Sequence, residues 1–155
     1  MHLSIKAGDD SARIFAGSPG AAIRLPTPSP DGRWIAYTSN ESKRTEVFVR
    51  PIAGDGRWQV STEGGTQPVW ARDGKTLYYR ETGHIVAATV SSGATFAVVS
   101  RHVFADDRFA LENTINYDAL PDGKLAVVVP VDNGGAQQIN VIVNWIDEIR
   151  KKLPK

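Results

Sequence analysis

One nine-residue phrase occurs three times in this chain of 155 residues. Its copies read SPDGRWIAY from Ser29 to Tyr37, ARDGKTLYY from Ala71 to Tyr79 and, in a weaker form, LPDGKLAVV from Leu120 to Val128. Asp-Gly between apolar runs favours a hairpin turn, because Gly tolerates positive φ and the Asp side chain accepts hydrogen bonds from nearby backbone amides. Such a unit repeated about every 40 to 50 residues, with little helix, is typical of the blades of a β-propeller.

The β-forming runs between the turns predict a single all-β domain over residues 1–155. We expect about three four-stranded antiparallel β-propeller blades, roughly half of a six-bladed ring, followed by a short C-terminal helix. The predicted parts are a partial blade at 1–16, a blade at 21–61, a blade at 66–104, an incomplete blade at 113–145 and a helix at 145–153.

The repeated turn residues are assigned a structural role. They are Asp31, Gly32, Asp73, Gly74, Asp122 and Gly123. Three large flat side chains, those of Trp34, Trp58 and Trp70, are expected to fill the gaps between neighbouring sheets.

Four stretches carry a resemblance to a known family: SPDGRWIAYTSNES, EVFVRPI, GRWQVSTEGGTQPVWARDGKTLYYR and VIVNWIDEI. They resemble TolB-like six-bladed β-propellers with PD repeats, in particular the propeller part found behind bacterial serine/threonine kinase domains. The resemblance covers roughly residues 11–153, although the third phrase lacks the aromatic residue after its turn. It implies a protein-binding platform, and a periplasmic or extracytoplasmic location if the chain is part of a longer protein.

The length of the chain predicts an assembly. Closed propellers have about four to eight blades of about 42 residues each, so 155 residues supply between three and four. An open arc would expose unpaired sheet edges. Because the chain begins with outer strands of one blade and ends with inner strands of another, we predict a homodimer in which two half-rings close one six-bladed ring. A four-bladed ring, an irregular sandwich and a piece of a longer protein are the alternatives.

Composition excludes several classes of partner. The net charge is +1, with 18 basic and 17 acidic residues, whereas nucleic-acid binding usually needs a clustered basic surface. No stretch approaches the roughly 18 apolar residues of a membrane span, and residues 1–20 lack the apolar core of a signal peptide. As written, the chain is therefore expected to stay in the cytoplasm, without a nucleic-acid or membrane partner.

The candidate site follows from aligning the repeats. The innermost strands are predicted at Ile23–Thr27, Gln67–Ala71 and Thr114–Ala119, and they line a propeller's central channel. These segments should otherwise be buried, but they carry the polar residues Arg24, Gln67, Asn116 and Tyr117. Buried polar groups need partners, which are each other, water or a ligand. We predict that these four residues line the channel and bind the ligand.

The same residues favour binding over catalysis. A metal-dependent reaction needs convergent carboxylates or histidines, and the three histidines, His2, His84 and His102, lack zinc-type spacing. We expect a non-enzymatic module for protein or peptide binding, with no catalytic residue, cofactor or metal. The alternatives are a metal-dependent hydrolase or lyase with its site in the channel, and a purely structural half-propeller unit without a ligand.

Overall fold

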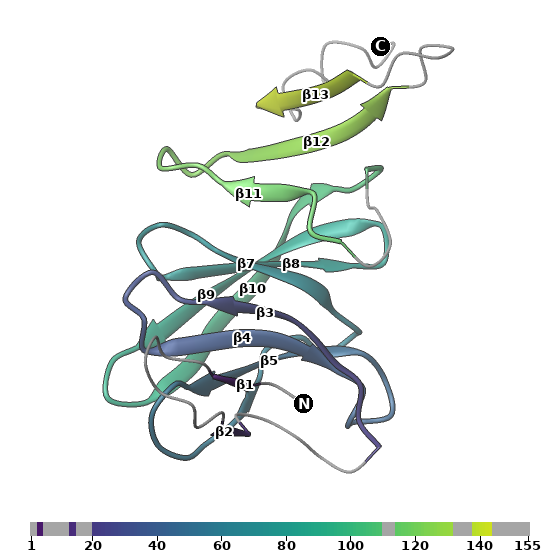
Figure 1. Cartoon of the computed structure of the whole chain (residues 1–155). Helices are drawn as coiled ribbons and strands as arrows, with labels where there is room; N and C mark the ends of the chain where they lie inside the picture. The colour runs from purple at the N-terminus through teal and green to yellow at the C-terminus, as the bar shows by residue number, and fades with distance from the viewer. Residues whose placement is uncertain (1–2, 5–12, 15–19, 110–113, 132–137, 144–155) are drawn as a thin grey trace.

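The computed structural model describes residues 3–4, 13–14, 20–109, 114–131 and 138–143, and these residues form strands, turns and loops but no helix. The helix predicted at 145–153 lies outside the described residues. Within them, no helix is long and apolar enough to cross a membrane. Figure 1 shows the sheets stacked face to face along the molecule, from the N-terminal strands at one end to β13 at the other.

Three antiparallel sheets form the blades. The first blade contains β3 (Ile23–Pro28), β4 (Trp34–Ser39), β5 (Glu46–Pro51) and β6 (Trp58–Gln59). The second contains β7 (Thr66–Trp70), β8 (Thr76–Glu81), β9 (His84–Ser92) and β10 (Phe96–Asp106). The third contains β11 (Tyr117–Ala119), β12 (Leu125–Val131) and β13 (Gln138–Val143). The short strands β1 (Leu3–Ser4) and β2 (Arg13–Ile14) pair with each other.

The Asp-Gly turns join the first two strands of each blade. In each turn the aspartate accepts a hydrogen bond from the amide two residues on, at 3.1 Å for Asp31, 2.9 Å for Asp73 and 3.2 Å for Asp122. The following glycines have φ of 68°, 68° and 79°, a region that an L side chain rarely enters. The Asp-Gly pair therefore has the same local conformation in all three copies of the phrase.

The third turn differs from the other two by one residue. Its closing hydrogen bond joins Leu120 to Lys124, whereas the earlier turns join Ser29 to Trp34 and Ala71 to Thr76. A shift of one residue exchanges the two faces of a strand. Because of this shift, Leu125 faces the second blade and packs in the apolar core between the second and third blades.

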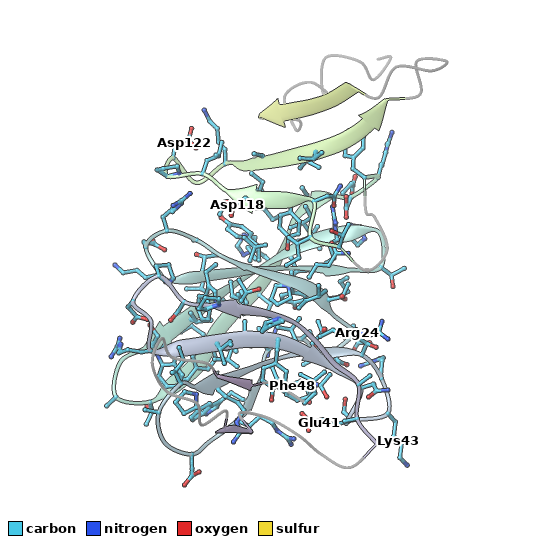
Figure 2. The ribbon with its side chains drawn as sticks, viewed as in Figure 1. Arg24, Glu41, Lys43, Phe48, Asp118 and Asp122 are labelled. Carbon is cyan, nitrogen blue, oxygen red and sulfur yellow. The ribbon has the colours of Figure 1, made fainter. Side chains whose placement is uncertain are left out.

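The first strand of each blade lies at the shared inner edge, so that β3, β7 and β11 are neighbours. Side chains link them: Thr27 Oγ1 donates to the Pro68 carbonyl at 2.9 Å, and Tyr117 Oη donates to the Gln67 carbonyl at 2.6 Å. The turns and the other strand ends lie on opposite sides of the stack, as the positions of Asp122 and Arg24 in Figure 2 show.

An aromatic cluster fills the first junction, the interface between the first and second blades. The Phe96 ring, 2% exposed, lies 5.4 Å from Trp34, 5.9 Å from Trp58 and 6.4 Å from Trp70 between ring centroids. The Trp70 indole also donates to the Thr27 carbonyl at 3.1 Å. These tryptophans therefore lie between neighbouring sheets, where the sequence placed them.

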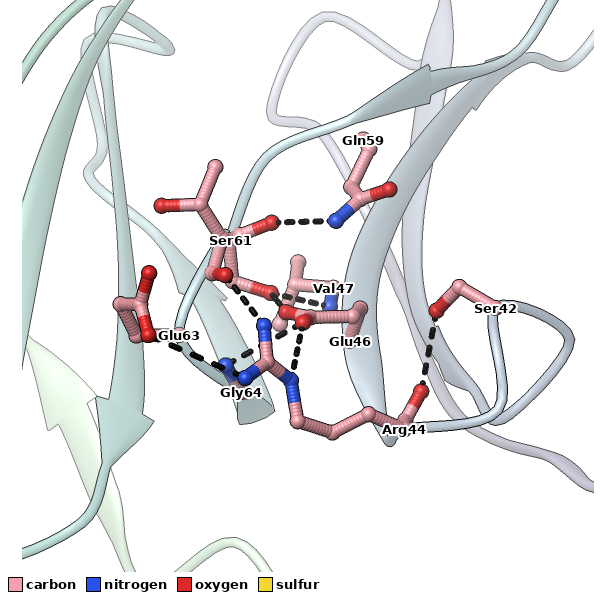
Figure 3. A network of polar contacts seen from close by, with 9 residues as sticks. Ser42, Arg44, Glu46, Val47, Gln59, Ser61, Glu63 and Gly64 are labelled. Atoms are coloured by element: carbon pink, nitrogen blue, oxygen red, sulfur yellow. Dashed lines mark hydrogen bonds and ion pairs between the residues drawn. The ribbon is translucent and has the colours of Figure 1, made fainter.

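The chain passes from the first blade to the second through a polar network, drawn in Figure 3. The Glu46 carboxylate, 1% exposed, accepts from Arg44 Nε at 2.7 Å, from the Gly64 amide at 3.2 Å and from the Ser61 hydroxyl. A Cβ on Gly65 would lie 2.5 Å from Ser61 Oγ, so the backbone approaches closely here. The network fixes the start of β7 and one wall of the pocket described next.

Candidate functional site

A pocket with a volume of about 730 Å³ opens between the first two blades, at the ends of the strands opposite the Asp-Gly turns. The first blade contributes Ala22, Arg24, Leu25, Thr38, Asn40 and Thr45. The second blade and the segments beside it contribute Gly64, Gly65, Thr66, Gln67, Arg80, Glu81, Thr82, Gly83 and Asp107. This size lies within the range of small-ligand pockets, roughly 300–1,000 Å³.

Two residues of the pocket wall have strained backbones. Leu25 and Gln67 each have φ of 53°, and each precedes a proline at a bulge in its strand. Positive φ costs a residue with a Cβ about 1–3 kcal/mol and persists only where the surrounding structure imposes it. The two residues occupy equivalent positions of the repeat. The positive φ is therefore a feature of the bulge that bends each of these two inner strands at the pocket.

Three of the four predicted site residues meet around an arginine that the sequence analysis did not select. Arg80 Nη1 donates to the side-chain oxygens of Gln67 and Asn116, and the guanidinium lies 4.8 Å from the Tyr117 ring centroid. The Arg80 side chain also pairs with Asp107, and both side chains are 3% exposed. The polar groups of the inner strands are thus partners of one another in a cluster buried between the second and third blades.

Burial and charge set the electrostatics of this cluster. Tyr117 is 4% exposed, and burial raises the pKa of its phenol well above the usual value, an effect that the nearby Arg80 opposes. Asn116 has all of its principal hydrogen-bonding positions filled, because its amide nitrogen donates to the carbonyls of Phe109 and Val128 at 2.8 and 2.7 Å. Asn116 and Tyr117 therefore stabilise the junction and do not line the pocket.

Arg24 requires a correction. It was expected on a buried segment, but its side chain is exposed, because β3 alternates between half-buried and exposed positions along its whole length. It lines the pocket from the first blade, and Figure 2 shows it on the side of the stack away from Asp122. Of the four predicted residues, Arg24 and Gln67 line this pocket.

A sequence signal for Arg80 exists in the repeat itself. Arg80 ends the apolar run Leu77–Tyr79, and the first copy of the repeat has Thr38 at the equivalent position. A charged residue closing a buried strand needs a partner of opposite charge. That partner, Asp107, follows β10, too far along the chain for its pairing to be predicted from spacing.

A second hollow of about 370 Å³ lies on the outward face of the first blade. Its floor includes Tyr37, whose ring stacks on that of Phe48 with centroids 5.9 Å apart. Burial raises the pKa of Tyr37 to about 12. At the rim, Arg57 pairs with Glu41 at 2.6 Å and lies over the Phe48 ring.

The two histidines that the structure describes, His84 and His102, lie outside the linings of both hollows. His84 Nδ1 lies 3.2 Å from the exposed Asp106 carboxylate, and His102 is exposed on β10. Among the described residues, no three His, Cys, Asp or Glu side chains are grouped so that they could hold a metal ion.

Comparison with solved structures identifies the fold class. The chain aligns with a chain of the nidogen/laminin complex with a TM-score of 0.58 and 13% sequence identity, over 85% of this chain and 51% of that one. That neighbour contains a β-propeller, so the described sheets are propeller blades. The present chain spans about half the length of the solved chain that it matches.

Other solved structures align less closely. TolB from Acinetobacter baumannii aligns with a TM-score of 0.48 and 17% identity, over 87% of this chain and 45% of that one. Prolyl oligopeptidase B from Galerina marginata aligns with a TM-score of 0.45 and 18% identity, over 89% and 26%. No family model matches the sequence.

Proposed function

We propose that this chain is a non-enzymatic β-propeller module that binds a protein or peptide at the pocket between its first two blades. The observation that carries the proposal is the pocket itself, which lies where the inner strands end and combines apolar wall atoms with hydroxyl, amide and guanidinium groups. Ligand sites typically have this mixture of apolar surface and a few placed polar groups.

The charged groups at the floor support binding over catalysis. Arg80 and Asp107 are paired with each other at 3% exposure, and Asp107 also accepts the Phe109 amide at 3.0 Å. A group held in this way stabilises the fold and is poorly placed to exchange protons with a substrate. The hydroxyl and amide groups of the walls are better suited to hydrogen bonds with a polypeptide.

We propose further that two chains close one six-bladed ring. In the central part of β8 and β9 in the second blade, the side chains that face the first blade are apolar or aromatic and buried: Leu77, Tyr79, Val86, Ala88 and Val90, each at most 5% exposed. The equivalent outward face of the first blade carries Arg50 in place of Ala88, and Ile52, 45% exposed, in place of Val90. A second copy, presenting its third blade, would cover this face in the way one blade covers the next.

Light scattering on a sizing column tests the assembly. The chain has a mass of 16.8 kDa, so the proposed ring has twice that mass. Ile52→Glu should convert the dimer into monomers, because it places a charge in the proposed interface. Val99→Glu, at a 67% exposed site on the outer edge strand β10, is the matched control and should remain dimeric. A wild-type chain that stays monomeric at high concentration would refute this part of the proposal.

Selection from a displayed library of random dodecapeptides on immobilised protein tests the binding role. The half-buried Thr66 lies in the pocket wall, so Thr66→Arg should weaken the selected peptides at least about tenfold by filling the pocket. Thr62→Arg, at an exposed position outside the pocket, should leave their affinity unchanged. Equal affinity for both variants would show that the pocket is not the binding site.

A further inference from the structure

The hydrogen bonds of Arg80 leave one donor unused. A guanidinium has five N–H groups. Nε donates to Asp107 Oδ2, and the two hydrogens of Nη1 serve Gln67 and Asn116. One hydrogen of Nη2 faces Asp107 Oδ1 in a long contact of 3.4 Å, which leaves the other without a partner among the described residues. An unused donor on a side chain that is 3% exposed is costly unless a ligand or water accepts from it.

Asp107 supplies the complementary acceptor. Its Oδ1 accepts from the Phe109 amide and from Arg80 Nη2, whereas Oδ2 accepts only from Arg80 Nε among the described residues. A carboxylate oxygen can accept two hydrogen bonds, so Oδ2 keeps one free position. Both side chains line the pocket. Its floor therefore presents one free donor and one free acceptor on two groups in direct contact.

The charges of the lining select against ions. Two arginines, Arg24 and Arg80, and two carboxylates, Glu81 and Asp107, give a formal charge of zero. A ligand carboxylate brought to Arg80 would meet Asp107 directly beside it, and a ligand ammonium brought to Asp107 would meet Arg80. Like charges at such short range are repulsive, and the low local dielectric strengthens the repulsion.

An amide supplies both kinds of partner without a charge: a carbonyl can accept from Arg80 Nη2, and an N–H, of the same or a neighbouring amide, can donate to Asp107 Oδ2. The wall adds a further polar group, since the Thr66 hydroxyl, half-buried in the lining, makes no hydrogen bond within the described part of the chain. We infer that the pocket binds a neutral amide group of a peptide, either an Asn or Gln side chain or a main-chain unit. This inference rests on the proposed binding function and names the chemistry that its site recognises.

NMR titration of ¹⁵N-labelled protein with three small probes tests the inference. N-acetyl-asparagine methylamide carries a side-chain amide, N-acetyl-alanine methylamide only main-chain amides, and N-acetyl-aspartate methylamide a carboxylate. We expect the asparagine probe, at millimolar concentration, to shift the Arg80 Nε–H signal and the amides of Gly64, Gly65 and Gly83 around the pocket. If the alanine probe binds as tightly as the asparagine probe, the pocket contacts a main-chain amide. If the alanine probe binds more weakly, the pocket contacts the side-chain amide.

Where the asparagine probe binds more tightly than the alanine probe, the aspartate probe should bind at least about fivefold more weakly than the asparagine probe. An aspartate probe that in that case binds as tightly as the asparagine probe, or that binds more tightly than both amide probes, would overturn the inference, as would no shift of the pocket signals with any probe. Thr66→Val should weaken the amide probes about fivefold by removing one hydrogen bond. Thr76→Val, the same change on β8 outside the pocket, should leave their affinity unchanged. A display-selected peptide whose binding is weakened by Thr66→Arg, although no amide probe shifts the pocket signals, would overturn the amide inference and leave the proposed binding function standing.

Discussion

The two junctions between blades are built from the same repeat but are filled in different ways. The first is closed by apolar and aromatic side chains around Phe96, and its inner end is left open as the pocket. The second has an apolar core as well, but its inner end is closed by the cluster of Arg80, Asp107, Gln67, Asn116 and Tyr117. The two junctions therefore differ at the inner edge of the blades, and they are alike in having an apolar core between their sheets.

One repeat position accounts for much of this difference. Thr38 in the first blade and Arg80 in the second are equivalent. Each stands four residues after the first residue of its strand, which is Trp34 in β4 and Thr76 in β8. Thr38 is short and donates to the Arg24 carbonyl at 3.0 Å, so it leaves space beside it. Arg80 extends far enough to donate to Gln67 on β7, to Asn116 just before β11 and to Asp107 just after β10. A small residue at this position leaves a pocket, and a long one fills it.

The largest effect is expected when the filled junction loses its cation. Arg80→Met leaves the Asp107 carboxylate buried without its partner, which should lower the free energy of unfolding by about 3–5 kcal/mol. Denaturant unfolding followed by tryptophan fluorescence measures this change. Arg80→Met combined with Asp107→Asn removes the stranded charge and should recover part of the loss. If the single variant costs less than about 1 kcal/mol, the cluster does not hold the second junction together.

A smaller loss is expected from the hydrogen bond that joins two inner strands. Tyr117→Phe removes the phenol that donates to the Gln67 carbonyl at 2.6 Å and should destabilise the protein by about 1–2 kcal/mol. Tyr78→Phe is the matched control, because no hydrogen bond from its phenol is found within the described residues. Equal unfolding midpoints for the two variants would show that the bond between β7 and β11 contributes nothing.

The sequence predicted the blades well because their signals are local. Asp-Gly turns and alternating apolar residues determine where β4, β8 and β12 begin, and large aromatics mark the first junction. The inner edge was harder to predict, because its partners come from different blades: Arg80 meets Asp107 and Asn116 only after the sheets have stacked. The shorter third turn was also missed, since the phrase looks intact while the register after it is shifted by one residue. The candidate site therefore had the right strands but not its central residue.

The open junction should respond only mildly to a change at the position equivalent to Arg80. Thr38→Val keeps the shape of the side chain and removes one hydrogen bond, so we expect a loss of about 1 kcal/mol in unfolding free energy. The same denaturant unfolding assay compares this loss in unfolding free energy with that of Arg80→Met. If Thr38→Val costs as much as Arg80→Met, the first junction depends on polar contacts as much as the second does. The two junctions would then not differ in how they are stabilised.

The smallest effect concerns the first two turns, which are alike in backbone but not in side-chain contacts. Asp31 accepts from the Ser29 hydroxyl at 2.6 Å and from the Arg33 amide and guanidinium, and these bonds lower its pKa from 3.8 to about 2. A carboxylate whose pKa is lower in the folded state stabilises the fold above its unfolded pKa, and this contribution is lost as the pH falls through the folded value.

The stabilisation from Asp31 should therefore be complete above about pH 4 and disappear by about pH 2. Because the side chain is 40% exposed, solvent screening should keep the cost of Asp31→Asn below about 1 kcal/mol at neutral pH. The difference in unfolding free energy between wild type and Asp31→Asn should shrink over this pH range. Asp73→Asn should cost less at neutral pH, because within the described part of the chain the Asp73 carboxylate accepts only from the Lys75 amide. A difference for Asp31→Asn that stays constant from pH 4 to pH 2 would mean that the extra bonds of the first turn do not stabilise its charged form.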